Sequence, residues 1–324
     1  MGFLLISSKS RLVIAYLLLF AMIGQPVNAA QKISSWPTFF EPGRIAWRSL
    51  SYKVNNIFGK VTTDVYLSTS AAEEVADLLI TDPTGEALQP SGATVSKLTV
   101  HSRIDPLLGL EEILKTQSWF DPNGAGALQR IRQRLGQRKW QRSYRFTQQG
   151  VFRLKKIPKD SREENLPLEK WTKIRNHFYL YGDKGLECPQ ILEPASLLYI
   201  VSAIDLTTAH PPLNLCVFNK KQLHLVKVSV GGSQSLQVNY LEKLGDSQIR
   251  VDKKIDTIKI SFQPRSLAPT DIEPEAFSFL GLKGDFDIFI DKTSRIPVQV
   301  SGKIAAFGKV DIFLQEVTIS QNGI

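Results

Sequence analysis

The stretch GDFDIFIDKTSRIPVQVSGKIAAFGKVDIFLQ, residues 284–315, indicates the fold class. Apolar residues occupy every second position from Phe286 to Ile290, and the same spacing recurs in 298–300 and 310–314. A period of two residues places alternate side chains on opposite faces of a β-strand. Because turn-forming residues separate the three segments, they predict three successive antiparallel strands.

The same alternation extends outward over most of the chain after residue 40. We expect a hairpin of residues 45–54 and 58–67, and three successive antiparallel strands at 128–135, 140–146 and 151–157. Further strands are expected at 95–104, 171–181, 213–218, 223–230, 236–241, 249–251 and 255–262. Helices are expected at 70–80, 107–116 and 194–206. About a dozen strands against two or three short helices predict a mainly β protein, built as a single curved antiparallel sheet or a half-open β-barrel.

Residues 1–29 have the features of a cleavable signal peptide. Lys9 and Arg11 precede an apolar run at 12–23, and the segment ends on the small residue Ala29. The run is shorter than the roughly 20 residues that a membrane helix needs. An uncleaved anchor is the alternative. Cleavage predicts a periplasmic protein without a transmembrane span in the mature chain.

The mature chain, residues 30–324, is expected to form a single β-rich domain, and the charged segment 159–170 is the best candidate for a break within it. Export places Cys188 and Cys216 in an oxidising compartment, where an even pair of cysteines favours one disulfide. Two buried thiols that never meet are the alternative.

No catalytic, phosphate-binding or metal-binding motif occurs in the sequence. The acids Asp285, Asp287 and Asp291 resemble a calcium loop, but Ile290 stands where that loop requires glycine. The four histidines fall in four separate segments: His101, His177, His210 and His224. We therefore expect no metal and no cofactor, and catalytic activity has no support in the sequence.

The strongest chemical signal is a basic segment. The chain has 40 Lys and Arg against 31 Asp and Glu, a formal charge of +9. Residues 130–162 contain twelve basic residues and one acid, so their net charge is +11 and the rest of the mature chain carries −4. Five arginines of two neighbouring predicted strands are expected to face the same way: Arg130, Arg132, Arg134, Arg138 and Arg142.

Such a basic ribbon, with Trp140 in its second strand, can hold phosphates or carboxylates through forked arginine contacts. The alternative is a solvated strand face whose arginines pair with acids elsewhere. Nucleic acid is excluded as a partner by the predicted compartment.

The chain resembles the periplasmic proteins of domain of unknown function 3108. The resemblance rests on LSYKV at 50–54, GKV at 59–61, FDP at 120–122, EPASLLY at 193–199, GDFDI at 284–288, RIPVQV at 295–300 and GKV at 308–310. The proline–valine strand followed by a glycine hairpin is also similar to the periplasmic lipoprotein carriers. Those carriers are half-open barrels whose apolar concavity holds acyl chains, and this likeness concerns the fold alone.

These observations lead to one main expectation and two alternatives. The main expectation is a non-enzymatic periplasmic binding or carrier protein for an anionic lipid or another envelope amphiphile. The first alternative is an envelope assembly or scaffold factor that docks on an acidic protein or a cell-wall polymer. The second is an unrecognised hydrolase, which would need the scattered histidines or carboxylates to meet in one cleft.

Overall fold

The computed structural model describes residues 40–56, 59–81, 83–106, 111–136, 138–204, 212–268, 273–304 and 308–320. The predicted signal peptide and His210 therefore lie outside the described residues. Among the described residues, no helix combines the length and the apolar character that crossing a membrane requires.

The described chain is mainly β, as the alternation predicts. The strands of the first half are β1 (Trp47–Asn56), β2 (Gly59–Ala71), β3 (Thr94–Pro106), β4 (Glu112–Phe120), β5 (Ala127–Arg134), β6 (Trp140–Phe146), β7 (Gly150–Ile157) and β8 (Lys173–Leu180). Those of the second half are β9 (Ile191–Leu192), β10 (Leu213–Asn219), β11 (Gln222–Leu244), β12 (Ser247–Ser266), β13 (Ser278–Phe279), β14 (Leu282–Asp291), β15 (Pro297–Ile304) and β16 (Gly308–Ile319).

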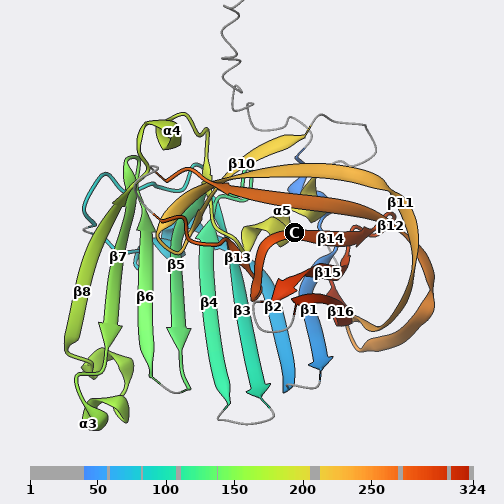
Figure 1. Cartoon of the computed structure of the whole chain (residues 1–324), viewed down its shortest axis with the longest axis horizontal. Helices are drawn as coiled ribbons and strands as arrows, with labels where there is room; N and C mark the ends of the chain where they lie inside the picture. Colours follow the sequence, from blue (N-terminus) through green and yellow to red (C-terminus); the bar gives the residue numbers. More distant parts are fainter. Residues whose placement is uncertain are drawn as a thin grey trace, which may run out of the picture. The chain divides into compact units, whose positions relative to one another are not determined.

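These strands form one curved sheet, ordered β8-β7-β6-β5-β4-β3-β2-β1-β16-β15-β14-β12-β11-β10-β9, with β13 paired to β14. A second pairing of β16, to the far end of β11, closes β11, β12, β14, β15 and β16 into a ring. Strands β1 to β8 extend from that ring as a broad open sheet (Figure 1). The half-open barrel prediction is confirmed, with the addition that the β9–β10 and β11–β16 pairings are parallel.

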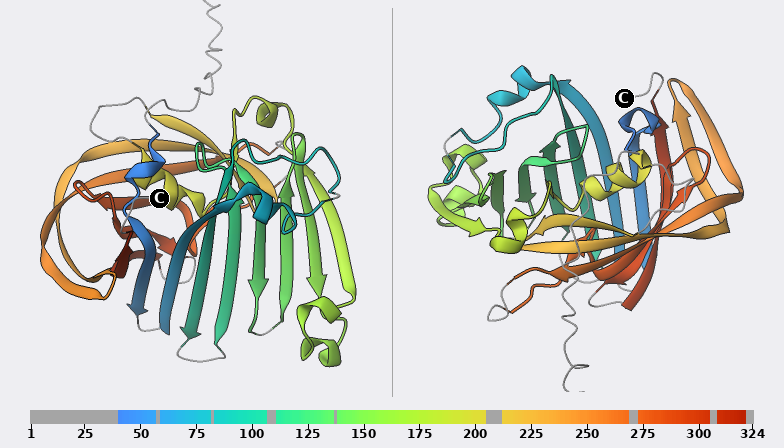
Figure 2. Two further views of the ribbon diagram at one scale, coloured as in Figure 1. Left: turned by 180° about the vertical axis from the view of Figure 1, so that it is seen from behind. Right: turned by 90° about the horizontal axis from the view of Figure 1, so that it is seen from above.

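The sheet curves around helix α5 (Ser196–Ala203), and we call the face toward α5 the inner face (Figure 2). All eight residues of α5 are buried. The indole Nε1 of Trp47 donates a hydrogen bond to Ser202 Oγ over 2.9 Å, and the rings of Phe120 and Tyr199 lie 4.9 Å apart. The inner face and α5 thus share one hydrophobic core, which extends through the ring.

The outer face carries a smaller core. Helix α2 (Ala72–Ala76) and the turn after it cover Val95, Trp119 and Leu128. The remaining helices are short: η2 (Pro42–Arg44), α3 (Ser161–Glu164), η3 (Leu168–Lys170) and α4 (Asp183–Leu186). The described residues therefore hold four α-helices where the sequence predicted two or three.

Two helix predictions fail because strand pairing extends further than expected. The helix predicted at 107–116 is wrong where the structure describes it, since β4 begins at Glu112 and pairs on both sides, with β3 and β5. The helix predicted at 70–80 shrinks to α2 because β2 continues to Ala71. The helix predicted at 194–206 is confirmed in its central part as α5.

The strand predictions hold better. The hairpin at 45–67 is β1–β2, and the three antiparallel strands after residue 127 are β5, β6 and β7. The strands predicted at 223–230 and 236–241 are one long strand, β11, which continues through a bulge at Gly231–Gly232. The segment 159–170 holds α3 and η3, and the sheet continues across it because β7 pairs with β8.

Candidate functional site

The inner face of β5 to β8 carries a row of like charges. The residue pairing across these strands puts four cations directly opposite one another in succession: Arg132, Arg142, Lys155 and Arg175. We call these four residues the cation row. On the other side of Arg132, the residues paired across successive strands are Thr116 on β4, Val100 on β3 and Val65 on β2. The inner face thus changes from cationic to apolar between β5 and β2.

The predicted arginines have different environments. Arg130, Arg132 and Arg134 share the inner face of β5, as their parity predicts, and Arg142 lies opposite Arg132 on β6. Arg138 instead is exposed in the turn between the strands, with a positive φ of 53°. It borders a second hollow of about 470 Å³ that Arg134, Trp140 and Lys155 also line.

Aromatic rings lie among these cations. The guanidinium carbon of Arg142 is 4.3 Å from the centre of the Trp140 ring, and that of Arg132 is 5.9 Å from it. Arg130 lies over Tyr144 at 4.4 Å. Cation–π contacts hold the guanidinium groups in place without neutralising their charge.

Two acids reach the inner face near Arg130 and Arg134. Arg134 forms an ion pair with Glu112 on β4. Arg130 Nη1 lies 4.0 Å from Glu193 Oε2 and donates a hydrogen bond to the Phe218 carbonyl over 3.3 Å. Glu193 precedes α5, and its Oε1 accepts a hydrogen bond from the Ser196 amide over 2.9 Å. The hydrogen bond that Glu193 accepts from the first residue of α5 thus also positions a carboxylate against Arg130.

Burial sets the electrostatics of this pair. Arg130 is 2% exposed and Glu193 is 1% exposed. Burial raises the pKa of Glu193, and the neighbouring Arg130 opposes that effect. Burial, together with the charges of Arg130 and Arg142, lowers the pKa of Arg132 to about 10, so Arg132 keeps its proton at neutral pH.

Several guanidinium atoms have no hydrogen-bond partner within the described part of the chain. They are Nε and Nη2 of Arg130 and the Nε atoms of Arg134, Arg142 and Arg153, all of them buried. A buried donor without a partner costs about 1–3 kcal/mol, and more when it is charged. An added acceptor that reached these buried atoms would remove this cost.

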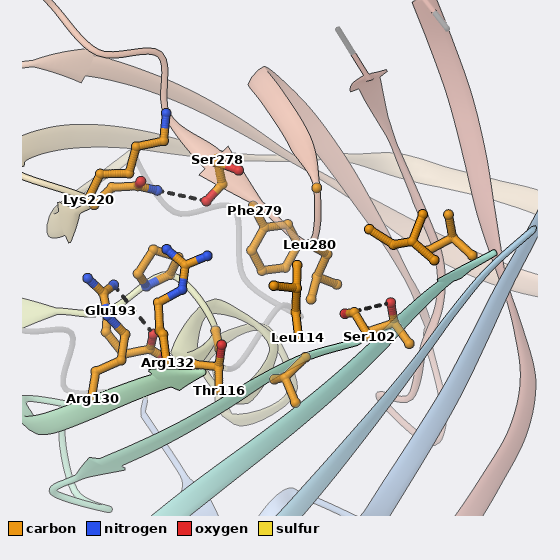
Figure 3. Close-up of a pocket in the computed structure, with 18 of the residues that line it drawn as sticks. Ser102, Leu114, Thr116, Arg130, Arg132, Glu193, Lys220, Ser278, Phe279 and Leu280 are labelled. Atoms are coloured by element: carbon orange, nitrogen blue, oxygen red, sulfur yellow. Dashed lines mark hydrogen bonds and ion pairs between the residues drawn. The ribbon is translucent and has the colours of Figure 1, made fainter. Parts of the chain in front are cut away.

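A cavity of about 300 Å³ lies against these arginines. Its walls are the inner face of β2 to β5, the segment Glu193–Ala195, the turn after β10, and residues 278–281. Figure 3 shows Arg130, Arg132 and Glu193 together at one end of the cavity. Most of the remaining lining is apolar and includes Val61, Val100, Ile104, Leu114, Phe279, Leu280 and Ile304. Its polar members are Thr63, Ser102, Thr116, Asn219, Lys220 and Ser278.

A tight turn places part of the apolar wall. Phe279 and Leu282 pair across the two-residue turn Leu280–Gly281, in which both φ angles are positive, at 47° and 89°. Glycine adopts such an angle readily, whereas a branched residue such as leucine rarely does. The turn projects Leu280 into the cavity opposite β4 (Figure 3).

The cysteine prediction is confirmed. Cys188 and Cys216 form a disulfide with their Cα atoms 6.1 Å apart. The bond joins the loop after α4 to β10, next to the parallel pairing of Ile191 with Cys216. It therefore anchors the segment that leads to Glu193 and the cavity wall.

The described histidines lie in separate places. His224 is buried on β11, where its Nε2 is 3.1 Å from the backbone carbonyl of Glu275. Burial lowers the pKa of His224, and His101 on β3 has a lowered pKa for the same main reason. His177 on β8 packs against Tyr179 at 4.3 Å.

Sequence reasoning missed two parts of the site. Arg153, Lys155 and Arg175 were not placed with the five predicted arginines, although odd-numbered cations recur in both β7 and β8. The cavity wall at 278–281 had no local signal, because its contact with β4 and β5 depends on the closure of the sheet. Glu193, which lies beside Arg130 at the cavity, was named only within the EPASLLY segment and had no predicted role in a site.

No protein-family model and no curated protein matches the chain. Among solved structures, it is similar to the crystal structure of a beta-barrel-like protein of domain of unknown function DUF1849 from Brucella abortus. The two share 9% sequence identity with a TM-score of 0.41, over 86% of this chain and 99% of the other. A likeness at this level assigns neither a family nor a function to the chain, and the resemblance to domain of unknown function 3108 stays a prediction.

Proposed function

We propose that this chain is an exported, non-enzymatic binding or carrier protein for a single-chain anionic amphiphile. Its apolar chain would occupy the cavity, and its head group would lie against Arg130 and Arg132. The observation that carries the proposal is Arg130, which is almost completely buried at the end of a largely apolar cavity with two donors free.

The size of the cavity supports one chain rather than two. Small-molecule sites enclose about 300–1,000 Å³, and this cavity, at about 300 Å³, is at the lower end. The proposal therefore narrows the anionic lipids expected from the sequence to amphiphiles with one slender chain.

Two observations support export and a binding role. The Cys188–Cys216 disulfide is typical of proteins in oxidising compartments, and residues 1–29 have the composition of a signal peptide. The cavity also favours binding of a small amphiphile over the alternative of a scaffold factor, because a scaffold needs no hollow behind its docking surface.

The proposal is tested by titrating the mature protein calorimetrically with dodecyl phosphate below its micelle concentration. Leu114→Trp replaces an aliphatic side chain of the cavity wall by a bulkier indole ring. Ile113→Trp puts the same indole ring on the outer face of the same strand and is the matched control. We expect saturable binding to the wild type and to Ile113→Trp. Leu114→Trp should bind about tenfold more weakly, since displacing two CH₂ groups costs about 1.6 kcal/mol.

Circular dichroism and thermal unfolding would show that both variants fold. The proposal is wrong if dodecyl phosphate does not bind the wild type, or if folded Leu114→Trp binds it as tightly as Ile113→Trp does.

A further inference from the structure

The cation row is unusual because no ion pair within the described residues engages it, although the nearby charge of Glu193 favours the charged form of Arg132. Side chains directly opposite one another on neighbouring strands have Cβ atoms about 4.5–5.5 Å apart, and like charges in such pairs are destabilising. Burial and the charges of Arg142, Arg153, Arg175 and Lys173 together lower the pKa of Lys155, which lies within this group. The strands thus hold a set of mutually repelling cations in fixed register.

Three acids near this face are already engaged, whereas a fourth, Glu164, borders the second hollow together with Lys155 and forms no ion pair within the described residues. Glu193 and Glu112 lie against Arg130 and Arg134. Asp160, which borders the second hollow, accepts hydrogen bonds from the Arg162 and Glu163 amides as the N-cap of α3. Within the described residues, no ion pair joins an acid to any member of the cation row.

The row also begins where the cavity ends. Arg132 lines the cavity and is at the same time the first member of the row. From Arg132 the row crosses three strand spacings to reach Arg175. With strands about 4.8 Å apart, the charges extend over about 14 Å, far more than one phosphate or carboxylate can contact.

We propose that the head group of the ligand is an elongated oligoanion that lies along the cation row. Successive units of the head group each carry a phosphate or a carboxylate, and these groups bind Arg132, Arg142, Lys155 and Arg175 in turn. This inference rests on the proposed function, because the same ligand places its apolar chain in the cavity. It adds that several spaced negative charges, rather than a single one, define the ligand class.

The test compares three probes with matched shapes. They are the dodecyl glycoside of a trimer of galacturonic acid, dodecyl maltotrioside as its uncharged counterpart, and the galacturonic acid trimer without a chain. At low ionic strength we expect the acidic glycoside to bind about tenfold or more tightly than dodecyl maltotrioside, since each charged contact contributes a modest amount. High salt should reduce this difference, because partly exposed charges are screened.

Lys155 and Lys156 provide the matched variants. Lys155 belongs to the row, whereas Lys156 is the next residue on β7 and faces the other side of the sheet. Combining Lys155→Gln with Arg142→Gln and Arg175→Gln should remove most of the preference for the acidic glycoside, and Lys156→Gln should preserve it. A dodecyl trisaccharide phosphorylated on each sugar, tested in the same way, distinguishes phosphate from carboxylate as the preferred anion.

Equal affinity for the acidic and uncharged glycosides would overturn the oligoanion proposal. The proposed function would survive that result if the wild type still bound dodecyl phosphate more tightly than the Leu114→Trp variant does. Equal affinity for the trimer with and without its dodecyl chain would contradict both, and would favour docking on an acidic polymer.

Discussion

Arg130 and Arg145 are both almost completely buried, on opposite faces of the sheet, and they differ in what their guanidinium groups contact. Arg145 is 1% exposed and donates to the carbonyls of Ile80, Leu128 and Leu88, the last two over 2.7 and 2.6 Å. It holds the segment after α2 against β5 and β6. Arg130 has two atoms without a partner and lines the cavity. Exposure alone therefore does not separate a structural arginine from one that we propose to bind a ligand.

This difference gives the first prediction. Arg145→Met should lower the free energy of unfolding by about 3 kcal/mol or more, because three buried or partly buried carbonyls lose a charged donor. Dodecyl phosphate affinity of the folded fraction should not change. Arg132 lines the cavity beside Arg130, and Arg132→Met should have the opposite effect. It should weaken dodecyl phosphate binding with little loss of stability. Urea unfolding and calorimetry measure the two effects, and a weakened affinity in Arg145→Met would contradict the assignment.

Glu193 gives a prediction about pH. Burial raises its pKa above the usual 4.5, so the folded chain retains a proton that the unfolded chain has lost. This contribution to stability is complete below about pH 4.5 and is lost as the pH rises through the raised pKa. Glu193→Gln cannot titrate at this position. The unfolding free energy of the wild type should therefore fall relative to that of Glu193→Gln as the pH rises from 4.5.

Urea titrations of both proteins across the acidic and neutral range test this sign. A difference that stays constant would mean that Arg130 offsets the effect of burial on the carboxylate, and one that grows in favour of the wild type with rising pH would mean that Arg130 outweighs it. Either result would contradict the prediction.

At the scale of the elements, strands were predictable wherever alternation continued for several residues. β5, β6 and β7 appeared at the expected positions because parity and glycine turns are both local. The error at 107–116 has a different cause, since β4 forms through its pairing with β3 and β5 rather than through a local preference. The same distinction holds for the site. Parity put Arg130, Arg132 and Arg134 on one face, whereas the cation row depends on register across four strands.

The repulsion within the row leads to a prediction about stability. Raising the salt concentration should raise the unfolding free energy of the wild type, because dissolved ions screen the repulsion within the cation row. At 0.1 M salt the screening length is about 10 Å, so repulsion at shorter distances is weakened only in part. Lys155→Gln should be as stable as the wild type or more stable at low salt, and should respond less to added salt. Lys156→Gln should show the full salt response of the wild type. Thermal unfolding at several ionic strengths measures this, and a larger salt response in Lys155→Gln would contradict it.

At the scale of the whole molecule, the site depends on segments far apart in the sequence. The closure of β11 onto β16 and the packing of α5 bring Glu193 and the 278–281 turn against strands from the first half of the chain. Composition and alternation predict the curved sheet, but no local pattern specifies which apolar side chains leave a hollow between them. This is why the basic face could be predicted residue by residue, whereas an apolar cavity could only be hypothesised and its lining residues could not be predicted.

The disulfide acts at this scale. Cys188 and Cys216 are 28 positions apart, and closing a loop of that size stabilises the folded state by about 3–4 kcal/mol in the chain-entropy model. Replacing both cysteines by alanine should lower the unfolding free energy by about that amount, as urea unfolding would show. Reducing the disulfide of the wild type, with both cysteines kept, should lower the unfolding free energy by a similar amount. A loss below about 1 kcal/mol would contradict this prediction. It would mean that the unfolded chain without the bond keeps structure that already restricts the loop.

The proposed function requires the cavity and the basic inner face to form one site for an anionic amphiphile. Crystals of the mature protein with dodecyl phosphate brominated at the end of its chain would locate both parts of the probe directly. We predict an anomalous bromine peak among Leu114, Phe279 and Leu280, with the phosphate against Arg130 and Arg132. A bromine peak outside the cavity, or no peak in crystals that hold the probe's phosphate elsewhere, would contradict the account.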